Sequence, residues 1–283
     1  MYVQKTTAVN TKAEILTEVE ELVALVNSAK APNADSIVAS AQPISVVIPF
    51  AQGDDETKLL YLIRSIEKSF DEPHKVIILG AKPELNLDVL VIENESKSSN
   101  KEINLVHALQ AACLNAEVSE KFVVAQLDTY FISPVTLADL SLLKTAKSRI
   151  LTISDEQAFT NTLRLLSDKG IENARSFACL LPFVIEKSKF AGLFSEFPEL
   201  DAIPTFIETI YYNYYFGSHS SLELNFEKDN VRLNLISADP NVAKVKELIA
   251  NKKFLTVWDS AKGDFSENYL NVKFAEKCSL ELE

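Results

Sequence analysis

Four short apolar runs, alternating with helical segments, restrict the possible fold of this chain more than any other feature. The runs are rich in β-branched residues, as expected of strands buried on both faces of a sheet, and span residues 44–49, 75–80, 87–92 and 122–125. Apolar residues at helical spacing occupy 57–70 and 102–115. This order predicts βαβ units with right-handed crossovers. We therefore expect an α/β fold with a mainly parallel central sheet flanked by helices.

Composition narrows the class of function. The 283 residues are 47% hydrophobic and carry a formal net charge of −12. This acidity argues against a nucleic-acid-binding surface, and no apolar run approaches the roughly 20 residues that a membrane helix needs. The first residues lack the apolar core of a signal peptide, and the three widely spaced cysteines fit reduced thiols. We expect a soluble protein that is cytoplasmic or phage-associated.

The N-terminal segment has a character of its own. Residues 11–30 have the apolar spacing of an amphipathic helix, and Thr11 and Glu14 are placed as a capping box. Residues 31–42 are rich in Ala, Ser, Asn and Pro and indicate a linker. We therefore predict an N-terminal helical extension over 1–42 and a single α/β domain over 43–283. A helix this short must dock, either on its own domain or on a protein partner or second copy.

The alternation loosens after Pro134. We expect strands over 150–153 and 254–257, and helices over 137–143, 159–168, 188–197, 204–216, 242–250 and from Tyr269 to about Phe274. Pro182 lies inside the apolar segment 177–185. Because proline cannot donate to a sheet ladder, this segment is expected to be an edge strand or irregular.

Asp128 follows the fourth apolar run and is the leading candidate for chemistry. Ligands of open α/β sheets lie outside the carboxyl ends of the strands. A carboxylate there can coordinate a divalent ion that bridges a diphosphate. The same residue could instead serve an ordinary turn or helix cap, because Asp-Thr is common turn chemistry. Tyr130, two residues further on, is a candidate for cofactor binding.

An acidic run, Asp54-Asp55-Glu56, follows the first strand. In such a sheet Asp54 and Asp55 would lie where a nucleotide base or ribose binds. Alternatively, Asp55 caps the following helix, whose dipole favours an acidic residue at its start. The sequence contains no Gly-x-Gly-x-x-Gly or Walker loop, which disfavours dinucleotide-dependent dehydrogenases and P-loop NTPases.

Three further features are weaker candidates. His219, in a serine-rich turn, is the one histidine that we consider as a general base. Asp259 follows a short strand and Trp258, and could instead cap the last helix. The aromatic cluster 211–216 could stack on a sugar, although aromatic residues at this density more often form core.

Several segments together resemble a family of bacterial and phage glycosyltransferases. These are ISVVIPF, LLYLIRSIEK, KVIILGAKPEL and KFVVAQLDTYFI, followed later by SFACLLPFVIEKSKF, TFIETIYYNYYFG, KFLTVWDSAKGDF and the terminal SLELE. The family has a nucleotide-diphospho-sugar transferase fold and is related to Stealth-type capsule sugar-phosphate transferases. The resemblance covers roughly residues 44–283. It implies a nucleotide-sugar donor, a glycan acceptor, and Mn²⁺ or Mg²⁺ held by Asp128.

The chain departs from that family at both of its motifs. Where the family usually carries Asn-Asp-Asp-His-Phe, residues 127–131 read Leu-Asp-Thr-Tyr-Phe. Where it usually carries Asp-Thr-His-x-Pro, residues 178–182 read Ala-Cys-Leu-Leu-Pro. The groups lost are those that coordinate a hard cation or transfer a proton at neutral pH. Because a lost general base alone costs about two to four orders of magnitude in rate, catalysis is expected to be impaired or absent.

Two functions therefore remain open. The first is a glycosyltransferase-like protein with impaired or absent catalysis, in which Asp128 holds the metal ion, the Asp54–Glu56 turn meets the nucleotide, and Asp259 or His219 assists transfer to a hydroxyl acceptor. The second is a non-catalytic structural or binding module, for example a subunit of a phage or surface complex, that reuses the fold. The two altered motifs and the docking helix favour the second.

Overall fold

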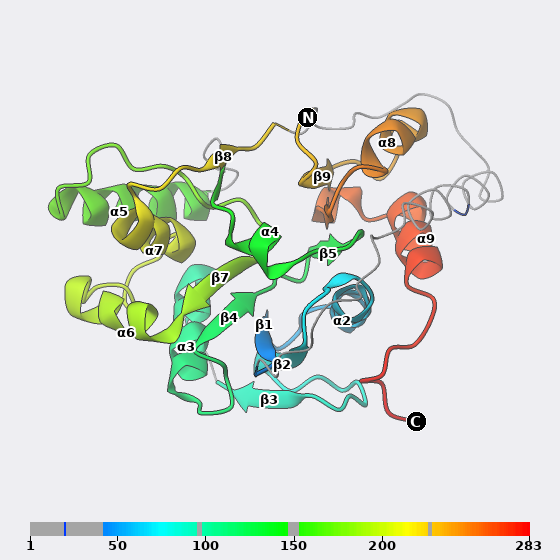
Figure 1. Ribbon diagram of the computed structural model, residues 1–283, viewed down its shortest axis with the longest axis horizontal. Helices are drawn as coiled ribbons and strands as arrows, with labels where there is room; N and C mark the ends of the chain where they lie inside the picture. Colours follow the sequence, from blue (N-terminus) through cyan, green and yellow to red (C-terminus); the bar gives the residue numbers. More distant parts are fainter. Residues whose placement is uncertain (1–19, 21–41, 95–97, 147–152, 226–227) are drawn as a thin grey trace.

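A five-stranded sheet forms the centre of the molecule, as the computed structural model shows (Figure 1). The structure describes residues 20, 42–94, 98–146, 153–225 and 228–283. The sheet has the order β3-β2-β1-β4-β7, with β1 Ile44–Phe50, β2 His74–Gly80, β3 Leu90–Glu93, β4 Lys121–Val124 and β7 Phe183–Glu186. The first four strands run parallel and β7 is antiparallel at the edge. The expected α/β fold with a mainly parallel central sheet is confirmed.

Two helices cover opposite faces of this sheet because alternate residues of β1 point in opposite directions. Val46 and Ile48 pack in one core cluster with Leu59 and Ile63 of α2, Glu56–Ser69. Val47, between them, packs in a second cluster with Val106 and Leu109 of α3, Lys101–Leu114. Figure 1 shows α2 and α3 to either side of β1 and β2. The two helices therefore sandwich the sheet.

A second, smaller sheet extends the layer that contains α2. Its strands are β5 Thr129–Phe131, β10 Phe254–Val257 and β9 Arg232–Leu235, with β10 in the middle. β10 runs antiparallel to β5 and parallel to β9. The helices α8, Val242–Ile249, and α9, Asp264–Lys273, share the core cluster of this sheet.

Asp128 itself lies in a turn, the alternative that the sequence offered, but the residues after it form a strand that was not expected. Thr129–Phe131 continues as a strand paired with β10. The physical reason is burial: Tyr130 and Phe131 lie in the core, where Phe131 packs edge-on against Phe254 with ring centroids 5.1 Å apart. The turn at Leu127 and Asp128 therefore leads directly into a strand whose partner lies far along the chain.

The remaining elements are α4 Leu137–Ser141, β6 Lys144–Thr145, α5 Ile153–Asp168, α6 Lys187–Glu196, α7 Ile207–Phe216, β8 Leu222–Glu223 and the 3₁₀ turn η1 Asp259–Ala261. Of these, α5, α6 and α7 pack in the cluster on the α3 side, and α4, β8 and η1 contribute to the cluster on the α2 side. The strand expected over 150–153 is wrong at Ile153, which begins α5, and residues 150–152 lie outside the described part. The last helix begins at Asp264, earlier than expected. The antiparallel edge position of β7, directly after Pro182, agrees with the prediction from that proline.

The N-terminal extension lies almost wholly outside the described residues. The predicted helix 11–30 is represented only by Glu20, and the linker 31–42 only by residue 42, so both stay predictions, as does the division between 42 and 43. Within the described part, no helix combines the length and apolar character needed to cross a bilayer.

Candidate functional site

A cleft of about 890 Å³ opens at the carboxyl ends of β1, β2 and β3. Its walls come from the turns after these strands and from the first half of α3. The polar side chains that line it are Gln52, Asp54, Lys82, Glu93, Asn94, Lys101 and Asn104. This edge of an open α/β sheet is where ligands bind in such folds. Asp54, a predicted nucleotide contact, lines this cleft.

The floor of the cleft depends on a glycine. Gly80, at the end of β2, has φ +118°, and a Cβ atom at this position would lie 2.4 Å from the Phe50 carbonyl oxygen. The Ala81 N–H donates to the same oxygen at 2.8 Å. A side chain here would clash with backbone, so only glycine lets β1 and β2 end this close together. Asp54 closes the neighbouring turn by accepting from the Ala51 N–H at 2.7 Å.

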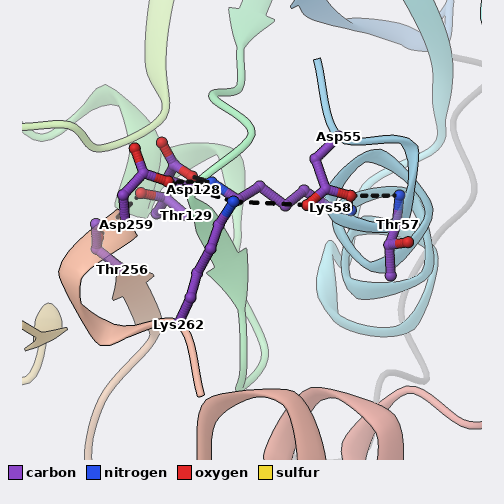
Figure 2. Close-up of polar contacts among 8 residues, drawn as sticks. All are labelled: Asp55, Thr57, Lys58, Asp128, Thr129, Thr256, Asp259 and Lys262. Atoms are coloured by element: carbon purple, nitrogen blue, oxygen red, sulfur yellow. Dashed lines mark hydrogen bonds and ion pairs between the residues drawn. The ribbon is translucent and has the colours of Figure 1, made fainter. Parts of the chain in front are cut away.

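Lys58, in the first turn of α2, joins two of the predicted acidic residues (Figure 2). Its ammonium group donates to Oδ1 of Asp128 and, at 3.2 Å, to Oδ1 of Asp259. Asp128 lies between β4 and β5, and Asp259 begins η1 directly after β10 and Trp258. The structure therefore brings together two residues that the sequence analysis chose separately. Their common partner, Lys58, is a residue that it missed.

A second lysine continues this network. Lys262 lies 3.5 Å from Asp259 and 3.7 Å from Asp55. Asp55 caps α2 by accepting from the backbone N–H groups of Thr57 at 3.0 Å and Lys58 at 3.3 Å. Asp55 thus has the capping role that the sequence analysis gave as the alternative to nucleotide contact. Asp55 is next in sequence to Asp54, which lines the cleft.

The two charges at the centre of the network stabilise each other. Burial lowers the pKa of Lys58, but the hydrogen bonds and charges of Asp128 and Asp259 outweigh it, so the pKa lies above its usual value. The hydrogen bond from Lys58 holds the pKa of the Asp259 carboxyl below its usual value. Lys58 is therefore an ammonium ion and Asp259 a carboxylate at neutral pH.

Tyr130, a candidate for cofactor binding, lies in the core instead of the cleft. Its side chain is 1% exposed, and burial raises the pKa of its hydroxyl group. The neighbouring Thr129 is also buried, and its hydroxyl lies 2.9 Å from that of Thr256 and donates to the Leu180 carbonyl at 2.7 Å. Thr129, Tyr130 and Phe131 therefore pack in the core. The side chain of Asp128 is partly exposed to solvent.

The two altered motifs lie side by side. The bond from Thr129 to Leu180 joins residues 127–131 to residues 178–182. Leu180 has φ +55°, the single positive value for a non-glycine residue in the described part of the chain. Such backbone strain is costly and persists only where the surroundings enforce it. Here the enforcing contacts include the Arg232 guanidinium, which donates to the Cys179 carbonyl.

His219 lies apart from Asp128 and Asp259. It is exposed after α7, where its ring packs edge-on against Phe216 at 5.4 Å between centroids. Figure 1 shows α7 on the opposite side of the molecule from β9 and α9. The structure does not bring this histidine to the acidic pair.

The aromatic cluster 211–216 is core in its first half, where Tyr211 and Tyr212 are buried. The hydroxyl group of Tyr211 accepts from the Glu186 N–H, and that of Tyr212 bonds both backbone groups of Val184. These contacts anchor α7 to the edge strand β7. The buried tyrosines are therefore structural and present no flat face to a sugar.

The donor set around Asp128 does not fit a divalent cation as the side chains are placed. The Lys58 ammonium already occupies the position between the two carboxylates. Across the residues that the structure describes, no group of three or more His, Cys, Asp or Glu side chains is arranged to hold a metal ion. The metal expected at Asp128 thus has a competitor that the sequence did not reveal.

Comparison with known protein families finds no match. Comparison with curated proteins finds none either. Among solved structures, the chain is similar to the apo structure of WbbM, a bifunctional glycosyltransferase, with 15% sequence identity and a TM-score of 0.43. The match covers 86% of this chain and 52% of that one, so this chain spans about half the length of the protein it matches. At this level of similarity the match assigns neither a family nor an activity.

Proposed function

We propose that this chain is a glycosyltransferase-like protein that binds a nucleotide-activated sugar, with catalysis impaired or absent. The observation that carries the proposal is the cleft of about 890 Å³ at the carboxyl ends of β1–β3, with Lys82 and Lys101 among its lining residues. A volume of this size lies within the range of roughly 300–1,000 Å³ that small-molecule and cofactor sites occupy.

The chemistry of the cleft suits a nucleoside better than an apolar ligand. Asn94 and Asn104 offer amide donors and acceptors, and Asp54 and Glu93 offer carboxylates to ribose hydroxyl groups. A diphosphate needs positive charge, which a chain of net charge −12 must supply locally. Lys82 and Lys101, which line the cleft, supply such charge.

The same geometry argues for weak catalysis. A general base works best when its pKa is near the working pH. The pKa of an aspartate is already far below neutral pH, and the hydrogen bond from Lys58 lowers the pKa of Asp259 further. Asp259 is also ion-paired with both Lys58 and Lys262. His219, the other candidate base, lies outside the network. We therefore expect binding of the donor with little or no sugar transfer.

Titration calorimetry with a panel of UDP- and GDP-sugars tests the proposal, with two tryptophan variants of α3 as a matched pair. Leu105 lines the cleft, whereas Leu114, on the same helix, is 88% exposed and outside it. We expect Leu105→Trp to fill the cleft and weaken binding at least about tenfold, or about 1.4 kcal/mol. Leu114→Trp should bind as the unaltered chain does. Absence of binding to the whole panel, or equal binding by Leu105→Trp, would contradict the proposal.

The alternative, a non-catalytic structural or binding module, is favoured by one observation. Asp128 and Asp259, the two acids chosen for chemistry, are both engaged by Lys58. This reading predicts no nucleotide-sugar binding and a protein partner or self-association through residues 11–30. Light scattering of the full chain and of a chain lacking 1–42 measures self-association. A monomer in both cases would contradict self-association through residues 11–30.

A further inference from the structure

We propose that the Lys58 ammonium replaces a divalent cation in this chain, so that the acidic pair Asp128–Asp259 binds no metal. A second inference, which rests on the function proposed above, is that nucleoside diphosphates bind independently of Mn²⁺ and Mg²⁺. The first statement concerns the chain alone and can be tested without any nucleotide.

The position of Lys58 is the first argument. Its side chain is only 16% exposed and reaches out from the first turn of α2. One nitrogen atom donates to Oδ1 of Asp128 and to Oδ1 of Asp259. Two carboxylate oxygens around one point are what a hard cation requires of a protein, because Mg²⁺ is commonly held by one or two carboxylates and water. Here that point holds an ammonium nitrogen.

The rigidity of the surroundings is the second argument. The Asp55 carboxylate caps α2 and fixes the backbone of Lys58 at 3.3 Å. The Asp128 carbonyl accepts from the Val257 N–H at 2.9 Å, which ties the chain around Asp128 to the end of β10. Asp259 follows β10 within two residues. Lysine and both acids are therefore held by regular elements, so the ion pairs form part of the fold.

The charge balance is the third argument. Lys58 supplies a positive charge shared by Asp128 and Asp259, and Lys262 supplies one shared by Asp259 and Asp55. A divalent cation entering beside Lys58 would meet a positive charge at close range, where the dielectric is lower than in bulk water. To displace the ammonium, it would have to leave a largely buried charge without its partners, which is unfavourable. Entry of a cation beside Lys58 and displacement of Lys58 by a cation are therefore both unfavourable.

The decisive experiment measures Mn²⁺ binding alone, by electron paramagnetic resonance of free Mn²⁺, on the full chain and on lysine variants. Lys58→Met should gain one Mn²⁺ site at least ~10-fold tighter than any site in the unaltered chain, since it removes the competing charge and frees both acids. Lys262→Met is the matched control, because Lys262 contacts Asp259 but not Asp128 in the ion pairs of the described residues. We expect it to gain no such site.

The origin of the gained site is checked by a double variant, Lys58→Met with Asp128→Asn, which should lose it. Lys58→Arg keeps the positive charge and should exclude Mn²⁺ as the unaltered chain does. If Lys58→Met does not fold, Lys58→Gln takes its place. The inference is overturned if the unaltered chain binds one Mn²⁺ ion that Asp128→Asn abolishes, or if no uncharged replacement at position 58 gains a site.

Calorimetric titration of UDP in EDTA and in Mn²⁺ tests the second statement. We expect the two affinities of the unaltered chain to agree within about twofold, a difference of ~0.4 kcal/mol. A tenfold or greater gain with Mn²⁺ would overturn metal independence. If neither UDP nor any nucleotide sugar binds in either buffer, the proposed function fails together with this second statement. The exclusion of metal by Lys58 is still decided by the Mn²⁺ measurement.

Discussion

Two buried tyrosines differ in what their hydroxyl groups contact. Tyr212, on α7, accepts from the Val184 N–H at 3.0 Å and donates to the Val184 carbonyl at 2.9 Å. The hydroxyl of Tyr269, on α9, is buried and has no hydrogen-bond partner among the described residues. A buried polar group without a partner costs free energy, whereas a paired one contributes about 0.5–1.5 kcal/mol per bond. The two sites therefore respond in opposite ways to loss of the oxygen.

We predict that Tyr212→Phe lowers the free energy of unfolding by about 1–3 kcal/mol, since it leaves the Val184 backbone groups unpaired. Tyr269→Phe should leave it unchanged or raise it by up to about 1 kcal/mol, since it removes an unpaired group and keeps the ring. Urea unfolding of both variants, followed by circular dichroism, measures the difference. A loss of stability in Tyr269→Phe equal to that in Tyr212→Phe would show that its hydroxyl group has a partner.

Single residues also show how far the candidate site could be read from the sequence. Asp128, Asp54 and Asp259 were identified because each follows an apolar run that predicts a strand. Lys58 was missed because a lysine in the first turn of a helix is common and gives no local signal. Its partners are 70 and 201 residues further along the chain, a pairing that no local pattern encodes.

At the scale of elements, the C-terminal tail is bound to α2 and to the loop before β3. Arg64 of α2 donates from Nε and Nη2 to the two carboxylate oxygens of Glu281 at 2.7 Å each, and from Nη1 to the Phe274 carbonyl at 2.9 Å. The Leu282 N–H donates to the Asn86 carbonyl. This bidentate pair is well oriented, and its side chains are 13% and 10% exposed.

The hydrogen bonds from Arg64 hold the pKa of Glu281 at about 2, below its ordinary value of 4.5. A lowered pKa gives stability that is present above the ordinary value and is lost as the pH falls toward the lowered one. We predict that Glu281→Gln destabilises the chain by ~1–2 kcal/mol at pH 7. The difference from the unaltered chain should shrink as the pH falls from 4.5 toward 2.

Urea unfolding followed by the fluorescence of Trp258, the sole tryptophan, measures this difference at pH 7 and at pH 3. Glu283→Gln is the matched control, because Glu283 is an exposed acid of the same tail. It should leave stability unchanged at both values of pH. A deficit in Glu281→Gln that is the same at pH 3 and pH 7 would show that the ion pair does not contribute.

At the scale of the whole molecule, two large core clusters organise the described residues. Both large core clusters of the described residues are formed between Ile44 and Phe274. One cluster joins the second sheet and the α2 face of the main sheet, and the other joins α3, α6 and α7 to the opposite face. Cores of this extent allow independent folding of a domain.

We predict that a chain of residues 43–283 folds on its own, with a cooperative unfolding transition and a urea midpoint close to that of the full chain. The reason is that both core clusters, as the described residues form them, lie wholly within residues 43–283. Circular dichroism and urea titration of both chains measure the outcome. A broad, non-cooperative transition of the shorter chain would show that the N-terminal segment completes the domain.

The sequence by itself determined the alternation of strands and helices and the class of fold. The apolar runs at 44–49, 75–80 and 122–125, and the helical spacing between them, are local patterns, and local periodicity is enough to define strands, helices and a mainly parallel sheet. The position of Asp128 after a strand followed from the same patterns.

Only the tertiary structure decided what Asp128 contacts. Strand β5 forms because Thr129–Phe131 pairs with β10, more than 100 residues later in the chain. The acidic pair forms because Asp259 follows β10 and shares the Lys58 ammonium with Asp128. Such contacts result from the packing of the whole chain around two cores, which no short window of sequence contains. The lysine between the two acids is therefore visible only in the folded molecule.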